Sequence, residues 1–281
     1  MYKLVVIDLD GTLLNDDNQI DKLSKMAVEA LCERHIKVAF ASDRSSRGTG
    51  AIRDKFDLCD FLDYSLYFNG ACVVDNKNNK MLINKYLSGN DFIPLSKLVT
   101  EDDIYIYAFN AEKIIVSEMN TYAYEDAYKN NTSIVSQSRE ALTNAPIIYK
   151  YVIAGNSEKL DRIEASITSD LKKNYSIVRT YKNRLEFYHS TANKGQAMKI
   201  LTELNGCLLE ETMAIGDAGN DIEMIISAGQ GIAMGNATDE VKSKADYVSA
   251  TNNNGGVAKA LEKFILDEDL RNKLKPEVSV M

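Results

Sequence analysis

The stretch of sequence that decides the fold is KLVVIDLDGTLL, residues 3–14. Its first part, up to Ile7, is a short apolar run rich in valine and isoleucine, which is typical of a buried strand in a parallel sheet. Asp8 and Asp10 follow at once, and Gly11 then allows the chain to turn sharply. Two carboxylates beside a buried strand are costly unless a cation or a reaction requires them. The stretch therefore predicts a site at the end of a strand.

The two aspartates suit the transfer of a phosphoryl group. Asp8 could attack phosphorus and form an aspartyl phosphate, and Asp10 could protonate the leaving oxygen and then activate water. The competing interpretation is a helix cap followed by a turn. A single aspartate would favour the cap, whereas the whole stretch 8–14 favours the reactive pair.

Two further polar segments follow apolar runs. Ser42 comes after the run 38–41, and the loop GDAGND, residues 216–221, comes after the run 213–215. In open α/β sheets the carboxyl ends of the strands form the edge where ligands bind. A hydroxyl there can hold phosphate oxygens, and Asp217 offers the hard oxygen that magnesium prefers. Taken alone, each segment also fits a helix cap or a glycine-rich turn.

Three other residues are candidates for the same site. Asn220 can orient phosphate, and Asp221 can hold the loop or a water in the outer shell of a metal. Lys194 begins a predicted helix, residues 194–204, and a lysine near transferred phosphate would offset its charge. Local sequence does not single out Lys194, because most lysines are solvated at the surface.

The order of elements predicts a chain in two parts. Strands and helices alternate before residue 85 and after residue 185, which indicates a parallel sheet covered on both faces. The segment between is denser in strand-forming residues. We therefore expect a Rossmann-like α/β core at 1–85 and 186–281 and an inserted α/β cap at 86–185. The main elements expected in the insert are strands at 104–107, 114–116 and 147–153, and a helix at about 158–172.

The composition limits the classes of partner that the protein can bind. The formal net charge is -8, which opposes binding to nucleic acid or anionic membranes but not to small anions at a local site. No apolar run has the length of a membrane span, and the run before Asp8 is too short for a secretory signal. None of the four cysteines has the spacing of a metal or redox motif, which favours buried thiols in a cytoplasmic protein. They are Cys32, Cys59, Cys72 and Cys207.

Four of these segments, in their order along the chain, resemble the motifs of the haloacid dehalogenase-like superfamily. Residues 8–14 resemble the first motif, Ser42 the second, Lys194 the third and residues 216–221 the fourth. The long segment between the second and third motifs is where the Cof-like phosphatases carry their cap. The resemblance implies a type IIB cap and hydrolysis of small phosphomonoesters, often sugar phosphates.

The resemblance also implies roles for individual residues. Mg²⁺ would be bound by Asp8, the backbone carbonyl of Asp10, and Asp217, with Asp221 in the outer shell. The residues implied to hold phosphate are Ser42, Lys194 and Asn220, with Arg44 of the second motif as a further ligand.

Two stretches depart from the family pattern. The second motif usually reads Thr-Gly-Arg, whereas residues 42–44 read SDR. A carboxylate beside phosphate would oppose binding, so we expect Asp43 to point away, capping the next helix or pairing with Arg44 or Arg47. Residues 252–255 read NNNG where the family usually carries acidic residues.

Two other functions remain open at this point. A phosphomutase would use the same aspartyl phosphate, and a non-catalytic protein could bind a phosphorylated ligand in the same pocket. The binder needs neither a nucleophile nor an acid/base, so the presence of both Asp8 and Asp10 favours the enzyme. The expected partner is a small phosphorylated metabolite; oligomeric state is not encoded in these motifs.

Overall fold

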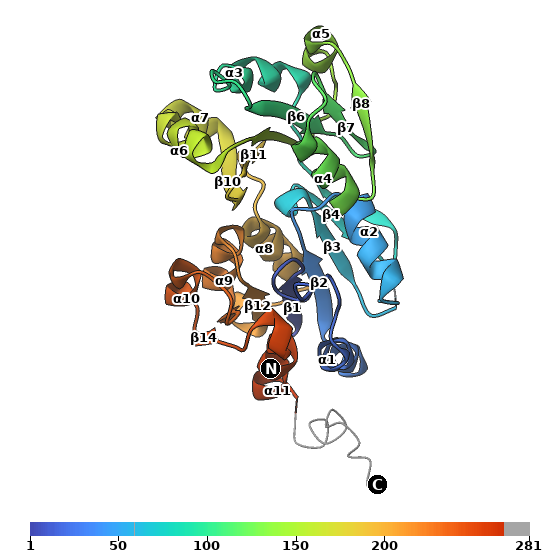
Figure 1. The fold of residues 1–281 in the computed structure, drawn as a ribbon. Helices are drawn as coiled ribbons and strands as arrows, with labels where there is room; N and C mark the ends of the chain where they lie inside the picture. The colour runs from blue at the N-terminus through green and yellow to red at the C-terminus, as the bar shows by residue number, and fades with distance from the viewer. Residues whose placement is uncertain (59, 267–281) are drawn as a thin grey trace, which may run out of the picture.

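The structure is a computed structural model that describes residues 1–58 and 60–266. The described chain is built on two sheets, one in the core and one in the inserted cap (Figure 1). Within these residues, no helix combines the length and the apolar character needed to cross a membrane. Cys32, Cys72 and Cys207 are free thiols, and Cys59 lies outside the described residues.

The core sheet has eight strands in the described residues. They are β1 (Leu4–Asp8), β2 (Lys37–Ala41), β3 (Tyr64–Tyr67), β4 (Cys72–Asp75), β5 (Lys80–Asn84), β12 (Thr212–Gly216), β13 (Gln230–Ala233) and β14 (Tyr247–Val248). Their order is β14-β13-β12-β1-β2-β3-β4-β5; the pairs from β14 to β3 are parallel, and β4 and β5 add an antiparallel edge. The parallel core expected from the sequence is therefore confirmed.

Helices cover both faces of this sheet. They are α1 (Lys22–Glu33), α2 (Ser46–Lys55), α8 (Lys194–Leu204), α9 (Ile222–Ser227), α10 (Asp239–Lys244) and α11 (Gly256–Phe264). Alternate residues of β1 point to opposite faces: Val5 and Ile7 pack in the cluster with α1 and α11, while Leu4 and Val6 pack in the cluster with α8 and α9. Burial on both faces explains why the strand is a continuous apolar run.

The register of the central strands brings the predicted motifs together. Strand β1 lies between β2 and β12, and all three are parallel. Ile7 is level with Ile215 and with Phe40. The residues that follow these strands, Ser42 and Asp217, therefore lie with Asp8 at one edge of the sheet.

The cap is built on a six-stranded sheet with the order β10-β11-β9-β6-β7-β8 in the described residues. The strands are β6 (Tyr105–Phe109), β7 (Lys113–Val116), β8 (Ser133–Ser136), β9 (Lys150–Ala154), β10 (Tyr175–Tyr181) and β11 (Arg184–His189), and the helices are α3 (Phe92–Ser96), α4 (Thr121–Lys129), α5 (Arg139–Thr143), α6 (Ser157–Ser166) and α7 (Ser169–Asn174). All pairs are antiparallel except β7 with β8.

Two details of the cap differ from expectation. The single helix expected at 158–172 is wrong: Ile167 is extended, and the Thr168 side chain caps a second helix by accepting from Leu171 N. Strand β11 crosses the boundary expected at residue 185 and pairs with β9 and β10, so we place the end of the cap after His189.

Hydrogen bonds join the cap to the second motif of the core. Arg44 Nη1 donates to the backbone oxygen of Lys129 at 2.8 Å, and Ser45 N donates to Asn130 Oδ1 at 2.7 Å. From β9, Lys150 Nζ donates to the backbone oxygen of Asp43 at 3.2 Å. The cap is therefore held directly over the edge of the sheet that carries the motifs.

Candidate active site

The centre of the site is a buried lysine between two aspartates. Lys194 Nζ donates to Asp8 Oδ1 at 2.6 Å and to Asp221 Oδ1 at 2.7 Å. The Lys194 and Asp221 side chains are 1% and 0% exposed, so these contacts are shielded from solvent. Lys194 opens α8, and the Asn193 side chain caps that helix. The third and fourth motifs thus meet Asp8 of the first motif.

Asp217 is held at the same place by the first motif. Thr12 Oγ1 donates to Asp217 Oδ1 at 2.8 Å. Gly11 has φ +82°, and a Cβ at this position would collide with Asp217 Oδ2. Glycine is therefore required both for the backbone conformation and for the close approach of the Asp217 carboxylate.

The Asp221 carboxylate shapes the fourth motif. Its Oδ2 accepts from the backbone N–H groups of Asp217 and Ala218, both at 3.0 Å, while its Oδ1 accepts from Lys194. Both oxygens are therefore occupied by protein donors. This arrangement agrees with the outer-shell role expected for Asp221 and leaves Asp8 and Asp217 as the carboxylates more open to a metal.

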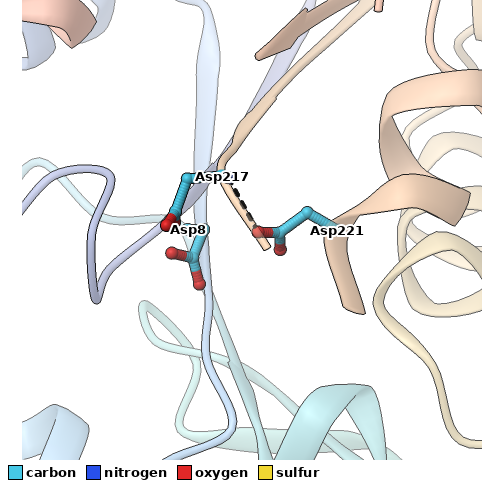
Figure 2. A group of neighbouring side chains, drawn as sticks. All are labelled: Asp8, Asp217 and Asp221. Carbon is cyan, nitrogen blue, oxygen red and sulfur yellow. Dashed lines mark hydrogen bonds between the residues drawn. The ribbon is translucent and has the colours of Figure 1, made fainter. Parts of the chain in front are cut away.

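The charges of this cluster do not balance. Asp8, Asp217 and Asp221 each offer an oxygen within 4.8 Å of the others (Figure 2), and Lys194 is the cation bonded to two of them. With all three carboxylates ionised, one ammonium leaves two negative charges. Burial is the largest cause and the nearby charge of Asp221 the second in raising the pKa of both Asp8 and Asp217. The pKa of Asp217 rises to about 7. Hard oxygen donors with an excess of two negative charges fit a divalent cation such as Mg²⁺.

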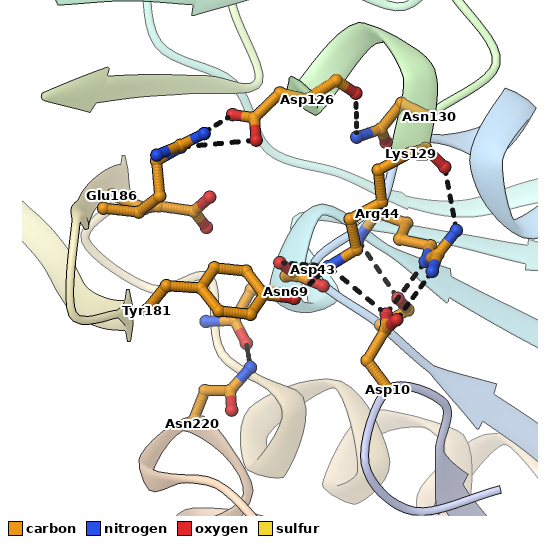
Figure 3. A network of polar contacts seen from close by, with 12 residues as sticks. Asp10, Asp43, Arg44, Asn69, Asp126, Lys129, Asn130, Tyr181, Glu186 and Asn220 are labelled. Carbon is orange, nitrogen blue, oxygen red and sulfur yellow. Dashed lines mark hydrogen bonds and ion pairs between the residues drawn. The ribbon is translucent and has the colours of Figure 1, made fainter. Parts of the chain in front are cut away.

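Asp10 is held by cations of both parts of the chain (Figure 3). Arg44 donates to both carboxylate oxygens, from Nε to Oδ2 at 2.8 Å and from Nη2 to Oδ1 at 2.6 Å. Lys129 Nζ of the cap lies 3.5 Å from Oδ2. Burial opposes ionisation here, but Lys129 and then Arg44 hold the pKa of Asp10 below its usual value. Arg44, expected on phosphate, is thus placed on Asp10 and would have to move to reach a phosphate.

The expectation that Asp43 points away from the site is wrong. Asp43 lines the cavity beside Asp8, and its Oδ2 lies 3.8 Å from Lys129 Nζ. Ser45, not Asp43, caps α2. Although burial opposes it, Lys129, Lys150 and other nearby cations hold the pKa of Asp43 well below its usual value. Positive charge from the cap therefore offsets the electrostatic cost of a buried carboxylate at this position of the second motif.

A cavity of about 360 Å³ opens beside Asp8. Asp8, Asp10, Asp217 and Asn220 line it. Asn220 Nδ2 also donates to Asn69 Oδ1 at 3.3 Å, which fixes its amide at the rim (Figure 3). Four of the eight predicted site residues therefore line one cavity, whereas Ser42, Arg44, Lys194 and Asp221 do not line it.

Ser42 does not line that cavity. It is fully buried, and its Oγ accepts from Arg44 N at 3.1 Å. It follows β2 at the expected edge, but the structure does not place it on the cavity wall. Its hydroxyl fixes the backbone of the second motif.

Several residues of the site carry no signal in local sequence. Lys129 and Tyr181 are ordinary residue types without motif spacing. Asn252, in the stretch that departs from the family pattern, lines the cavity and donates to Leu14 O at 3.1 Å. An amide can donate to a carbonyl where a carboxylate cannot, so asparagine at this position ties the loop after β1 in place.

Comparisons with known proteins agree with this geometry. The model of the haloacid dehalogenase-like hydrolases matches residues 5–261. This chain belongs to that family. YxeH of Bacillus subtilis, which is named as a phosphatase, is 31% identical over 95% of this chain and 99% of its own length. From the same organism, 5-amino-6-(5-phospho-D-ribitylamino)uracil phosphatase YcsE is 29% identical over 94% of this chain and 96% of its own length.

A solved structure has the same fold as this haloacid dehalogenase-like hydrolase. A sugar phosphatase of subclass IIB superimposes with a TM-score of 0.81 at 23% identity, over 94% of this chain and all of the other. The Rossmann-like core and the type IIB cap expected from the sequence are therefore confirmed for this hydrolase.

The buried lysine gives a first prediction. In Lys194→Met, Asp8 and Asp221 lose their shared cation, so the free energy of unfolding should fall by about 3–5 kcal/mol. Urea denaturation in EDTA measures this change. Lys199→Met, on the same helix, is the control and should be close to wild type. Equal stability of the two variants would contradict the central role of Lys194.

The contact between Asp43 and Lys129 gives a second prediction. A double-mutant cycle with Asp43→Asn and Lys129→Met should give a coupling energy of about 1–3 kcal/mol, because both groups are largely buried. The exposed pair Glu101 and Arg162, joined at 2.7 Å, is the control and should couple by less than about 1 kcal/mol. Coupling no larger than that of the control would show that the cap does not depend on Asp43.

Proposed function

We propose that this protein is a Mg²⁺-dependent phosphatase that hydrolyses small phosphomonoesters through an aspartyl phosphate on Asp8. The observation that carries the proposal is the uncompensated carboxylate cluster around Asp8, open to a cavity with Asp10 beside it. A purely structural ion pair would need no such excess of negative charge. A non-catalytic binder would not need the second carboxylate, Asp10.

In the first step Asp8 is the nucleophile. A carboxylate oxygen of Asp8 bonds to phosphorus while the bond from phosphorus to the leaving oxygen breaks. Asp10 donates its proton to that leaving oxygen, and the alcohol departs. Arg44 and Lys129 hold the Asp10 carboxylate when the site is empty, so substrate must displace part of this contact before Asp10 can carry a proton.

In the second step water attacks the phosphorus of the aspartyl phosphate. Asp10, now a carboxylate, takes the proton from water, the bond between Asp8 and phosphorus breaks, and inorganic phosphate is released. The cap excludes bulk water from the intermediate because it is joined to the core beside Asp10. Lys194 stays bonded to Asp8 and offsets charge on the transferred group.

The proposed metal ligands are Asp8, the backbone carbonyl of Asp10, and Asp217. When bound, Mg²⁺ supplies positive charge to the phosphoryl oxygens and reduces the repulsion between them and Asp8. The proposed phosphate ligands are Ser42, Arg44, Lys194 and Asn220. Of these, Asn220 lines the cavity, whereas Ser42, Arg44 and Lys194 do not.

The substrates are proposed to be small phosphorylated metabolites, with sugar phosphates as the leading class. The cavity of about 360 Å³ suits a small leaving group. YcsE, a relative over almost the whole chain, is named for a phosphate ester of a ribityl group. A hydroxyl-rich leaving group of that kind could form hydrogen bonds with Asn15, Asn18 and Asn252, which line the cavity.

The nucleophile gives a third prediction. Asp8→Asn should lower phosphate release from an aryl phosphate by at least about a thousandfold, because amide nitrogen and oxygen cannot replace the attacking carboxylate. Asp170→Asn, on the cap surface, is the matched control and should keep the wild-type rate. Release by wild type without a bisphosphate activator separates a phosphatase from a phosphomutase. Turnover by Asp8→Asn would contradict the assignment of Asp8 as the nucleophile.

The metal gives a fourth prediction. EDTA should stop phosphate release, and Mg²⁺ should restore it. Independently of activity, Mg²⁺ should raise the melting temperature of wild type, because a ligand that binds only the folded state stabilises it. In Asp217→Asn this increase should be much smaller, and NaCl at equal ionic strength should not reproduce it. Full activity in EDTA would refute the metal requirement.

A further inference from the structure

The Asp43 carboxylate differs from the other acidic side chains of the cavity beside Asp8. In the described part of the chain five aspartates line that cavity, and four of them accept a hydrogen bond from the protein. These four are Asp8, Asp10, Asp16 and Asp217, and their donors are Lys194, Arg44, Asn252 and Thr12 respectively. No described residue donates a hydrogen bond to either carboxylate oxygen of Asp43.

The nearby ammonium of Lys129 does not take the place of such a donor. Its Nζ lies 3.8 Å from Asp43 Oδ2, whereas an N–H···O hydrogen bond spans about 2.7–3.2 Å. The same Nζ lies 3.5 Å from Asp10 Oδ2 and donates to the hydroxyl of Tyr181. Lys129 therefore offsets the charge of Asp43 but leaves the carboxylate oxygens free to accept a hydrogen bond from a ligand.

A ligand in the cavity can reach this carboxylate. Asp43 lines the cavity, and 14% of its side chain is exposed. Nearby cations hold the pKa of Asp43 well below its usual value, so the group is ionised and can only accept hydrogen bonds. A largely buried charge without a donor is unfavourable. A ligand that brings a donor to Asp43 therefore gains binding energy, and one without a donor does not.

The position of Asp43 points to the leaving group rather than the phosphoryl group of a substrate. Asp8 is level with Ala41 on the neighbouring strand, so Asp10 and Asp43 each follow the paired residues by two positions. Lys129 Nζ faces both of these carboxylates (Figure 3). In the proposed reaction Asp10 protonates the leaving oxygen. The negative phosphoryl group is repelled by Asp43, so the part of the substrate beside Asp43 is the leaving group.

We propose that Asp43 is a specificity-determining residue whose carboxylate accepts a hydrogen bond from a hydroxyl of the leaving group, close to the ester oxygen. This inference rests on the proposed phosphatase function and deepens it, because it selects esters of polyols and sugars over esters of simple alcohols. A hydrogen bond to an ionised acceptor is stronger than one between neutral groups. An alkyl leaving group would leave the charged oxygens without a donor, which favours its rejection.

The test compares glycerol 3-phosphate with propyl phosphate, which has the same three-carbon chain without hydroxyls. Each competes with 4-nitrophenyl phosphate for the enzyme in Mg²⁺, so its inhibition constant reports binding whether or not it is hydrolysed. Wild type should bind glycerol 3-phosphate about ten- to a hundredfold more tightly, as expected for a hydrogen bond to a charged group. In Asp43→Ala, which removes the acceptor, this preference should largely disappear.

Two further variants separate a contact with the leaving group from a structural role. Asp43→Asn keeps one acceptor oxygen without the charge, so its preference should lie between those of wild type and Asp43→Ala. Asp161→Ala removes an exposed carboxylate of α6 that pairs with Arg179 at 3.0 Å and does not line the cavity, so it should keep the wild-type preference. A purely structural role of Asp43 would alter the binding of both competitors alike.

The possible outcomes distinguish the inference from the proposed function. Equal affinity of wild type for the two competitors, or an unchanged preference in Asp43→Ala, would overturn the role of Asp43 and leave the phosphatase function intact. Loss of activity on 4-nitrophenyl phosphate in both Asp43→Ala and Asp43→Asn would also overturn it, because that leaving group carries no further hydroxyl. Absence of phosphate release from 4-nitrophenyl phosphate by wild type would contradict the proposed function itself and the inference with it.

Discussion

The buried contact of Lys194 with Asp8 and Asp221 is the interaction on which the rest of the site depends. It joins the ends of β1, α8 and the loop after β12, which are distant in sequence. One ammonium cannot neutralise three neighbouring carboxylates, so the cluster retains negative charge that a divalent cation can compensate. The same excess that makes the site costly for folding makes it suitable for binding a metal and transferring a phosphoryl group.

Charged groups of the cap lie above the sheet and pair with carboxylates of the core. Lys129 brings a positive charge to Asp10 and Asp43, and Lys150 donates to the backbone of Asp43 while pairing with buried Glu186 at 2.7 Å. Opposite charges therefore alternate from the core into the cap. Because Lys129 lies on the cap, the position of the cap affects the charge around Asp10, the proposed acid/base.

Sequence reasoning succeeded where the signal was local. The apolar run before Asp8, the Asp-x-Asp pair and the Gly-Asp loop each predicted a strand with a polar end, and parallel strands bring such ends to one edge. It failed for the helix expected at 158–172, because the helical spacing of apolar residues continues across the extended Ile167. It failed for Asp43 because the compensating cation, Lys129, comes from another part of the fold.

The sequence by itself determined the two-part α/β organisation, the family and the identity of the aspartates at the strand ends. These follow from periodicity and residue type, which are properties of neighbours along the chain. The tertiary structure alone decided that Lys194 is buried between carboxylates and that Arg44 holds Asp10. Burial and pairing depend on which distant segments of the chain come into contact, and local sequence does not specify those contacts.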